Sequence, residues 1–149
     1  MRALGVDLGE RRIGLAISDS SGTLAFPYEV LERCGDSARD YLRVAALVSE
    51  LEAELVVVGL PLSLSGAEGA AARRARAEAK QIAAALKVPV ALFDERFSTV
   101  EAERRRRERT GPGRARRTAR KPAIDAEAAA VMLGAFLSAG RMDGGRARS

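Results

Sequence analysis

The amino-acid sequence predicts a single domain of the α/β class. Its 149 residues, 47% of them hydrophobic, suffice for one core and are too few for two large lobes. Strand-like patterns fill the first part of the chain, and from Asp36 onward helical patterns alternate with β-branched runs. This order is typical of a sheet that starts as a meander and continues through helical crossovers.

Three strands are expected at the start of the chain. Residues 3–8 form the first, residues 9–12 a turn, and residues 13–18 a second strand with alternating polarity. A third strand is expected over residues 24–31, at the edge of the sheet, because Pro27 has no backbone N–H to donate. Their closeness in sequence favours antiparallel pairing.

Helices and strands then alternate. Asp36 or Ser37 is expected to cap a helix whose apolar stripe is Tyr41, Val44, Ala45, Val48 and Leu51. The continuous apolar run at residues 55–61 is typical of a parallel strand buried on both faces. An alanine-rich helix over about residues 69–86 and a strand over residues 88–93 follow. The helix is expected to pack through Ala72, Ala75, Ala79, Ile82, Ala83 and Leu86.

Two more helices are expected near the end of the domain. Ser98 and Glu101 form a capping box for one of them. The last helix is expected to start near Asp125 and to pack through Ala128, Val131, Met132, Ala135 and Phe136. The domain is therefore expected to span residues 1–137, and the Gly- and Arg-rich residues 138–149 to form a disordered tail.

Composition excludes several kinds of chemistry. The chain has no histidine, and Cys34 is its only cysteine. An internal disulfide, a cysteine-based zinc site and a His-dependent catalytic triad are therefore excluded, so that carboxylates must carry any catalysis. No apolar stretch long enough for a membrane span and no signal peptide is visible, which predicts a cytoplasmic protein with no membrane partner.

Positive charge is concentrated in one segment. The net charge is +5, yet residues 104–121 contain ten Lys or Arg residues and only one acid, Glu108, so that the rest of the chain carries a net charge of −4. Gly111, Pro112 and Gly113 preclude one continuous helix, and a flexible basic loop is expected over about residues 109–121. A solvated connector is the simpler interpretation, but binding to a nucleic-acid backbone is favoured. The expected nucleic-acid-binding residues in this segment are Arg104, Arg105, Arg106, Arg107, Arg109, Arg114, Arg116, Arg117, Arg120 and Lys121.

Acidic residues occur where the predicted elements end or begin. Asp7 lies near the end of the first strand, Asp94 and Glu95 follow the last strand, and Asp125 opens the final helix. Taken singly, each is expected to be a turn former or a helix cap. Together they can converge outside the carboxyl ends of the strands, where like charges are tolerated if a divalent cation lies between them. Magnesium or manganese held in this way activates water for attack on a phosphodiester.

Four ordered blocks carry a family resemblance: "GVDLGERRIGLAISD", "VVVGLPLSLSGAEG", "ALFDERFSTVEAE" and "KPAIDAEAAAVML". They resemble the YqgF/RuvX family, an RNase H-like group of pre-16S rRNA nucleases and Holliday junction resolvases. The resemblance implies a mixed five-stranded sheet flanked by helices, with the second strand antiparallel. It also implies that Asp7, Glu95 and Asp125 are the catalytic and metal-binding carboxylates.

The alternation of side chains along a strand and the family resemblance both help to assign roles to Asp94, Glu95 and their basic neighbours. Adjacent strand residues point to opposite faces, so that Asp94 and Glu95 are not expected to bind the same metal ions. The alternation leaves open which of the two does so, and the resemblance selects Glu95. Arg96 and Lys121 are expected near the carboxylates, where each can hold the scissile phosphate or balance charge in a structural pair.

The resulting hypothesis is a metal-dependent endonuclease that processes the 5′ end of pre-16S rRNA in ribosome biogenesis. The first alternative is a Holliday junction resolvase, and the partner is then branched DNA instead of structured RNA. A second alternative is a nucleic-acid-binding module that does not catalyse. The first block also resembles the phosphate-binding hairpin of actin-like ATPases, but that fold needs two related lobes and this chain supplies one. Sequence leaves a monomer and a homodimer open.

Overall fold

The structure, a computed structural model, describes residues 1–62, 65–96 and 121–142. The helix expected after Ser98, the basic residues 104–120 and residues 143–149 lie outside this described part. The five described strands are β1 (Ala3–Leu8), β2 (Arg12–Ser18), β3 (Ala25–Glu32), β4 (Leu55–Leu60) and β5 (Val90–Asp94). The described helices are α1 (Ser37–Glu50), α2 (Ala70–Ala85) and α4 (Lys121–Met142).

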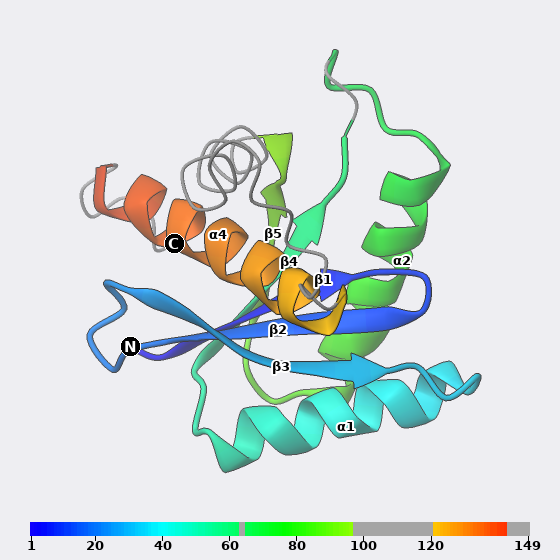
Figure 1. The fold of residues 1–149 in the computed structure, drawn as a ribbon, viewed down its shortest axis with the longest axis horizontal. Helices are drawn as coiled ribbons and strands as arrows, with labels where there is room; N and C mark the ends of the chain where they lie inside the picture. Colours follow the sequence, from blue (N-terminus) through cyan, green and yellow to red (C-terminus); the bar gives the residue numbers. More distant parts are fainter. Residues whose placement is uncertain (63–64, 97–120, 143–149) are drawn as a thin grey trace, which may run out of the picture.

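The strands form one mixed sheet in the order β3-β2-β1-β4-β5. β2 pairs antiparallel with both β1 and β3, whereas β1, β4 and β5 run parallel. β3 lies at the edge of the sheet, as Pro27 predicts. Helix α4 lies across one face, and α1 and α2 lie on the other (Figure 1). The predicted α/β class with a mixed five-stranded sheet is confirmed.

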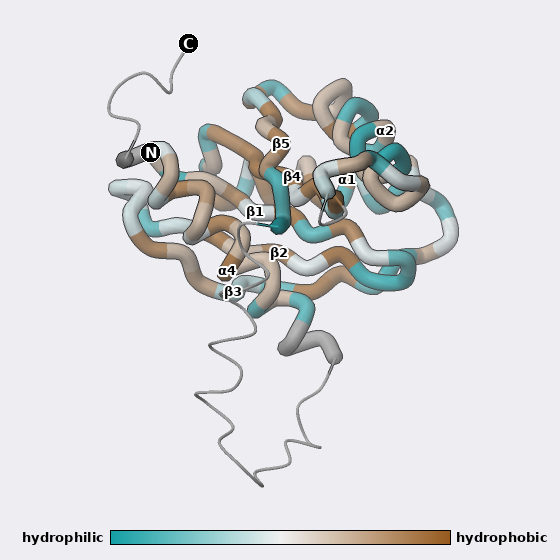
Figure 2. The backbone as a smooth tube through the Cα atoms, turned by 90° about the horizontal axis from the view of Figure 1, so that it is seen from above, coloured by the Kyte–Doolittle hydropathy of each residue, from teal (hydrophilic) through white to brown (hydrophobic). Residues whose placement is uncertain are grey.

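Strict alternation along β1 divides the core in two. Leu4 and Val6 belong to the core beneath α1 and α2, whereas Ala3 packs with the apolar side chains of α4. β4 is apolar on both faces, since Val56 and Val58 join the first core and Val57 the second. Figure 2 shows much of the central strands as hydrophobic and much of α2 as hydrophilic. The two layers of helices thus bury both faces of the parallel strands.

Helix α1 matches its predicted start. The Asp36 carboxylate accepts hydrogen bonds from the backbone N–H groups of Ala38 and Arg39, so that Asp36 is the cap. Tyr41, Val44 and Val48 are buried as expected. The predicted packing face of α2 is correct at Ala72, Ala75, Ala79 and Ile82, whereas Ala83 is exposed.

Helix α4 differs from the expectation in its start and its buried face. It begins at Lys121, ahead of Asp125, because Pro122 fits the first turn, where a backbone N–H has no helical partner to lose. Among the described side chains of α4, the buried ones are Ala126, Ala129, Met132, Leu133 and Leu137. Of the expected set, Met132 is buried and Phe136 packs, partly buried, against the same core. The helix is apolar nearly all round, and its sequence therefore does not indicate which side packs. It ends at Met142, beyond the boundary expected at residue 137.

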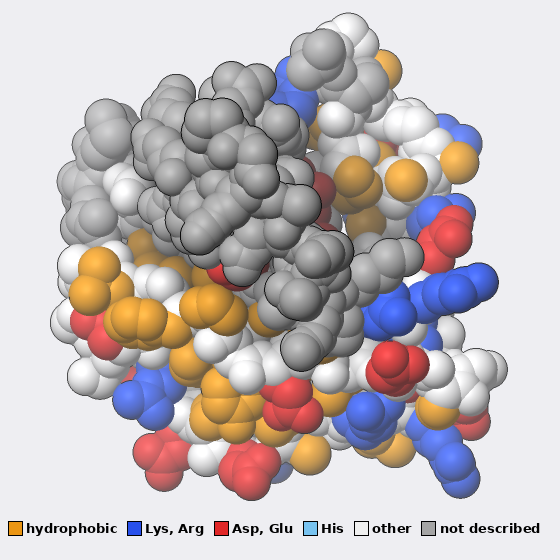
Figure 3. Space-filling view, in the orientation of Figure 1, with side chains coloured by type: hydrophobic (Ala, Val, Ile, Leu, Met, Phe, Trp, Pro, Cys, Tyr) orange, Lys and Arg blue, Asp and Glu red, His pale blue; other side chains and the backbone are white. Residues whose placement is uncertain are grey.

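The edge strand β3 has apolar side chains at the surface. Phe26 is 48% exposed and Tyr28 is 41% exposed. Figure 3 shows that hydrophobic side chains gather at the lower left of the face seen there, while acidic and basic side chains are interspersed at the lower right.

No described helix is long and apolar enough to cross a membrane.

Candidate active site

Asp7 lies on the face of the sheet that α4 covers. In β1 it has the same parity as Ala3 and Gly5, both of which pack against α4. Its backbone pairs with Gly14 of β2 near the carboxyl end of the strand, and its side chain is half-buried. The acid that interrupts the apolar run therefore points into the space between the sheet and α4.

Glu95 comes to the same face from β5. Its backbone N–H donates to the carbonyl of Leu60 at 3.0 Å, which continues the parallel pairing one residue past the strand. Phe93, two residues earlier, packs against α4 and stacks edge-on with Phe136. Glu95 shares its parity, so that its side chain lies on the Asp7 side of the sheet.

Asp94 is turned toward Arg96 instead. The Arg96 Nε donates to both Asp94 carboxylate oxygens, at 3.0 and 2.9 Å, and the Arg96 backbone N–H donates to Oδ1 at 2.9 Å. Hydrogen bonds from Arg96 lower the pKa of Asp94. The expectation that Asp94 and Glu95 diverge agrees with this geometry, and the Arg96 guanidinium lies in an ion pair.

The carboxyl groups of Asp7 and Glu95 share a hydrogen bond. Burial, the charge of Asp7 and the shared hydrogen bond raise the pKa of Glu95 to about 7. Burial also raises the pKa of Asp7, but there the hydrogen bond acts in the opposite sense. Burial thus makes both carboxyl groups hold a proton more readily than a free carboxyl does, and the hydrogen bond between them favours the proton on Glu95 over the proton on Asp7.

Asp125 approaches this pair from α4. Its charge contributes to the raised pKa of Asp7, and its side chain is half-buried. Its backbone carbonyl lies against Gly14 of β2. The structure thus brings Asp7 and Glu95 into direct contact and places Asp125 within electrostatic range. Within the described part of the chain, no three acidic, histidine or cysteine side chains are spaced as a finished metal site.

Two glycines that the sequence did not mark as functional leave room for Glu95 and for the backbone of Asp125. A Cβ atom at Gly59 of β4 would collide with the carboxylate of Glu95, and one at Gly14 would collide with the carbonyl of Asp125. A Cβ at Gly5 would lie 3.0 Å from the Leu133 Cβ. The available signal was a glycine inside an apolar strand, which often marks a close approach.

The predicted nucleic-acid-binding residues fall mostly outside the described part. Arg104, Arg105, Arg106, Arg107, Arg109, Arg114, Arg116, Arg117 and Arg120 all lie there. Lys121 is the first residue of α4, at the end of the helix that carries Asp125. A Cβ at Gly66 would lie 3.2 Å from the Arg96 Nη1, so that Arg96 lies beside the loop after β4.

Solved structures with similar folds include two resolvases. The RuvC of T. thermophilus, solved in complex with a Holliday junction substrate, matches with a TM-score of 0.60 at 21% identity, over 94% of this chain and 96% of that one. The fowlpox virus resolvase, solved with Holliday junction DNA, matches with a TM-score of 0.50 at 10% identity, over 93% and 98% of the two chains. These likenesses establish an RNase H-like fold.

Two relatives in sequence carry the same name. A protein of Anaeromyxobacter sp. (strain Fw109-5) named "Putative pre-16S rRNA nuclease" is 49% identical over 92% of this chain and 96% of its own length. One of the same name from Thermobifida fusca (strain YX) is 51% identical over 87% of this chain and 82% of its own.

These relatives define the class of this protein: it is a nuclease, a hydrolase of phosphodiester bonds. A family model described as "RuvX: Holliday junction resolvase" matches residues 1–139. The chain belongs to the RuvX family. The family resemblance of the four sequence blocks is thereby confirmed.

Proposed function

We propose that this nuclease is a metal-dependent endonuclease whose catalytic carboxylates are Asp7, Glu95 and Asp125. The observation that carries the proposal is the half-buried pair formed by Asp7 and Glu95, with the charge of Asp125 close by. Structural ion pairs join opposite charges, whereas this cluster collects like charges on one face. Such an arrangement is costly to folding and is typical of a functional site.

The donor chemistry of the cluster fits Mg²⁺ or Mn²⁺. Both ions prefer oxygen ligands, and carboxylates from two strands and a helix supply them. The raised pKa values of Asp7 and Glu95 indicate that a positive charge close to this pair would stabilise it. When bound, a divalent ion supplies Lewis-acid activation of water and neutralises charge on the phosphate.

The protein groups around the site then have defined tasks. Glu95, whose pKa is raised to about 7, would release its proton if a divalent cation bound at the cluster. Gly59 keeps the Glu95 carboxylate against the sheet, and Asp125 approaches from the opposite layer. Arg96 and Lys121 are candidate contacts to the phosphate backbone, and Arg96 would then also hold Asp94 away from the cluster.

We further propose that the substrate is the 5′ end of pre-16S rRNA, processed in the cytoplasm during ribosome biogenesis. The names of the relatives support this substrate. The basic residues 104–121 suit a phosphate backbone, as part of a chain whose remainder is mildly acidic. The alternative substrate is a Holliday junction, which the related RuvC structure contains. Symmetric junction cutting needs a homodimer, whereas trimming of an RNA end needs only a monomer.

The deciding experiment compares cleavage of a pre-16S RNA leader and a four-way DNA junction, each with Mg²⁺ or Mn²⁺. We expect metal-dependent cutting of the RNA by the wild-type protein. We expect at least about a hundredfold loss in Asp7→Asn, because the substitution removes a charge from the metal site and keeps its shape. Cutting of the junction alone would establish the resolvase alternative. If neither substrate is cut while RNA still binds, the binding-module hypothesis replaces this one.

A further inference from the structure

The turn that follows Asp7 lacks two features of a self-supporting hairpin turn. The N–H of Gly9 donates to the carbonyl of Arg12 at 2.9 Å, but within this fully described turn the N–H of Arg12 returns no bond to the Gly9 carbonyl. None of the described residues 9–12 has a positive φ. The turn is therefore not of the primed types, whose twist matches that of the flanking strands.

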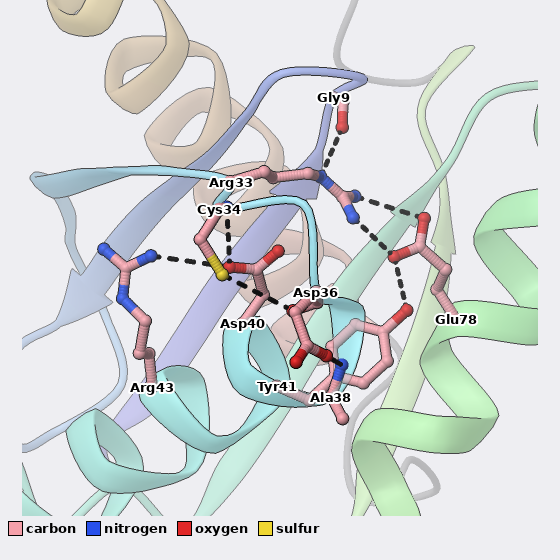
Figure 4. Close-up of polar contacts among 9 residues, drawn as sticks. All are labelled: Gly9, Arg33, Cys34, Asp36, Ala38, Asp40, Tyr41, Arg43 and Glu78. Carbon is pink, nitrogen blue, oxygen red and sulfur yellow. Dashed lines mark hydrogen bonds and ion pairs between the residues drawn. The ribbon is translucent and has the colours of Figure 1, made fainter.

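Arg33, the residue after β3, supplies the missing contacts. Its backbone N–H donates to the carbonyl of Arg11 at 2.9 Å, and its Nε donates to the carbonyl of Gly9 at 2.9 Å. Its two remaining guanidinium nitrogens donate to the two carboxylate oxygens of Glu78 in α2, at 3.0 and 3.1 Å. The planar guanidinium of Arg33 thus links the turn between β1 and β2 to helix α2 (Figure 4).

The Glu78 carboxylate, which binds the Arg33 guanidinium, is itself fixed by a second helix. The hydroxyl of Tyr41 in α1 donates to Glu78 Oε1 at 2.7 Å, so that two helices fix the carboxylate. The side chains of Arg33 and Glu78 are only 14% and 16% exposed. Bidentate pairs of this kind have a fixed geometry, and burial limits competition from water. Figure 4 shows Arg33 lying between the Gly9 carbonyl and the Glu78 carboxylate.

We infer that Arg33 is a positioning residue for Asp7, and that Glu78 and Tyr41 keep Arg33 in place. Asp7 pairs with Gly14, and only the Leu8–Ile13 pair separates it from the turn. Loosening of the turn would therefore shift the Asp7 carboxylate relative to Glu95. Misplacement of a reacting group by about 1 Å costs on the order of a hundredfold in rate. The inference rests on the proposed role of Asp7 as a catalytic carboxylate.

Three variants of the full chain test this role. Arg33→Lys keeps a positive charge for Glu78, but an ammonium group cannot reproduce the fork that also reaches Gly9. Arg33→Met removes both contacts. The matched control is Arg43→Met: the Arg43 Nη1 donates to the Glu32 carbonyl at 2.8 Å and pairs with Asp40 at 3.4 Å, but it does not contact the turn.

Two measurements are made on each variant. The first is hydrogen exchange at the Gly9 amide, which reports opening of the turn without any substrate. The second is the separate determination of kcat and KM on whichever substrate the wild type cuts. For Arg33→Lys we expect about tenfold faster exchange at Gly9, and a kcat about tenfold lower with KM changed by less than about twofold. For Arg43→Met we expect both quantities to stay at wild-type values.

The outcomes separate this inference from the proposed function. Unchanged Gly9 exchange in Arg33→Lys would overturn the inference, and so would faster exchange with an unchanged kcat. If Arg33→Met does not fold, the Arg33→Lys comparison still decides. If the wild type cleaves neither substrate, the proposed function fails, and the role of Arg33 in holding the turn is still decided by the exchange rates.

Discussion

Glu95→Gln should make the metal-free protein more stable at high pH. The pKa of Glu95 rises from an ordinary 4.5 to about 7 in the folded protein, because of burial and the nearby Asp7 charge. The folded state therefore binds the Glu95 proton more tightly than the unfolded state does. The contribution of this proton to stability is complete below about pH 4.5 and is lost as the pH rises to about 7.

The size of the effect follows from the pKa difference. At about 1.4 kcal/mol for each pKa unit, the rise from 4.5 to about 7 corresponds to about 3 kcal/mol of lost stability at pH 8. Glutamine has nearly the same shape and keeps an N–H donor for Asp7, but it carries no charge at any pH. We therefore expect Glu95→Gln to match the wild type near pH 4.5 and to exceed it by about 3 kcal/mol at pH 8.

Urea unfolding in EDTA at several pH values measures this difference. Comparison with the wild type at each pH cancels the titration of the groups that do not interact with Glu95. Asp94→Asn is the opposing control: Arg96 lowers the pKa of Asp94 from its ordinary 3.8, so that the stability this carboxylate contributes is complete above that pH. This variant should therefore be less stable than the wild type throughout the assayed range. A difference between Glu95→Gln and the wild type that stays constant with pH would refute the reasoning.

Magnesium provides a second arm of the same assay. A cation that binds the folded state alone raises the free energy of unfolding. At pH 8 we expect Mg²⁺ to stabilise the wild type and to stabilise Glu95→Gln much less, because one ligand charge is gone. Equal stabilisation of both proteins would show that Glu95 does not take part in cation binding.

Three further predictions concern other parts of the chain. Gly59→Ala should lower kcat about tenfold or more by displacing the Glu95 carboxylate. The control is Gly134→Ala, whose Cβ would meet only the Ala25 Cβ at 3.9 Å and which should leave kcat unchanged. An equal loss of kcat in both variants, measured by steady-state kinetics, would contradict this prediction. Asp36→Ala should reduce the free energy of unfolding by about 1 kcal/mol through loss of the α1 cap, and Asp36→Asn, which keeps an acceptor, should be close to the wild type in urea unfolding. Neutralising four arginines within residues 104–120 should weaken RNA binding and flatten its dependence on salt, and an unchanged slope in a salt titration would argue against backbone contact by this segment.

Local patterns predicted most of the elements. The alternating polarity of residues 13–18, the Asp36 cap and the unbroken apolar run of β4 each depend on neighbouring residues, and each forms the expected element. Pro27 marked the edge strand for an equally local reason, its missing N–H. The packing side of α4 could not be found in this way, since its apolar residues surround the helix and only the sheet beneath selects Ala129 and Leu133.

Sequence by itself predicted which side chains would carry the proposed chemistry, and the fold determined how these side chains lie relative to one another. The absence of histidine and the single cysteine predicted catalysis by carboxylates, and the family resemblance selected Asp7, Glu95 and Asp125 for this role. Only the tertiary structure decided that Glu95 and Asp7 share a proton, and that Gly59 makes room for the Glu95 carboxylate. It alone joined the end of β3 to the turn beside Asp7. These relations depend on burial and on contacts between residues far apart in the chain, which no local pattern records.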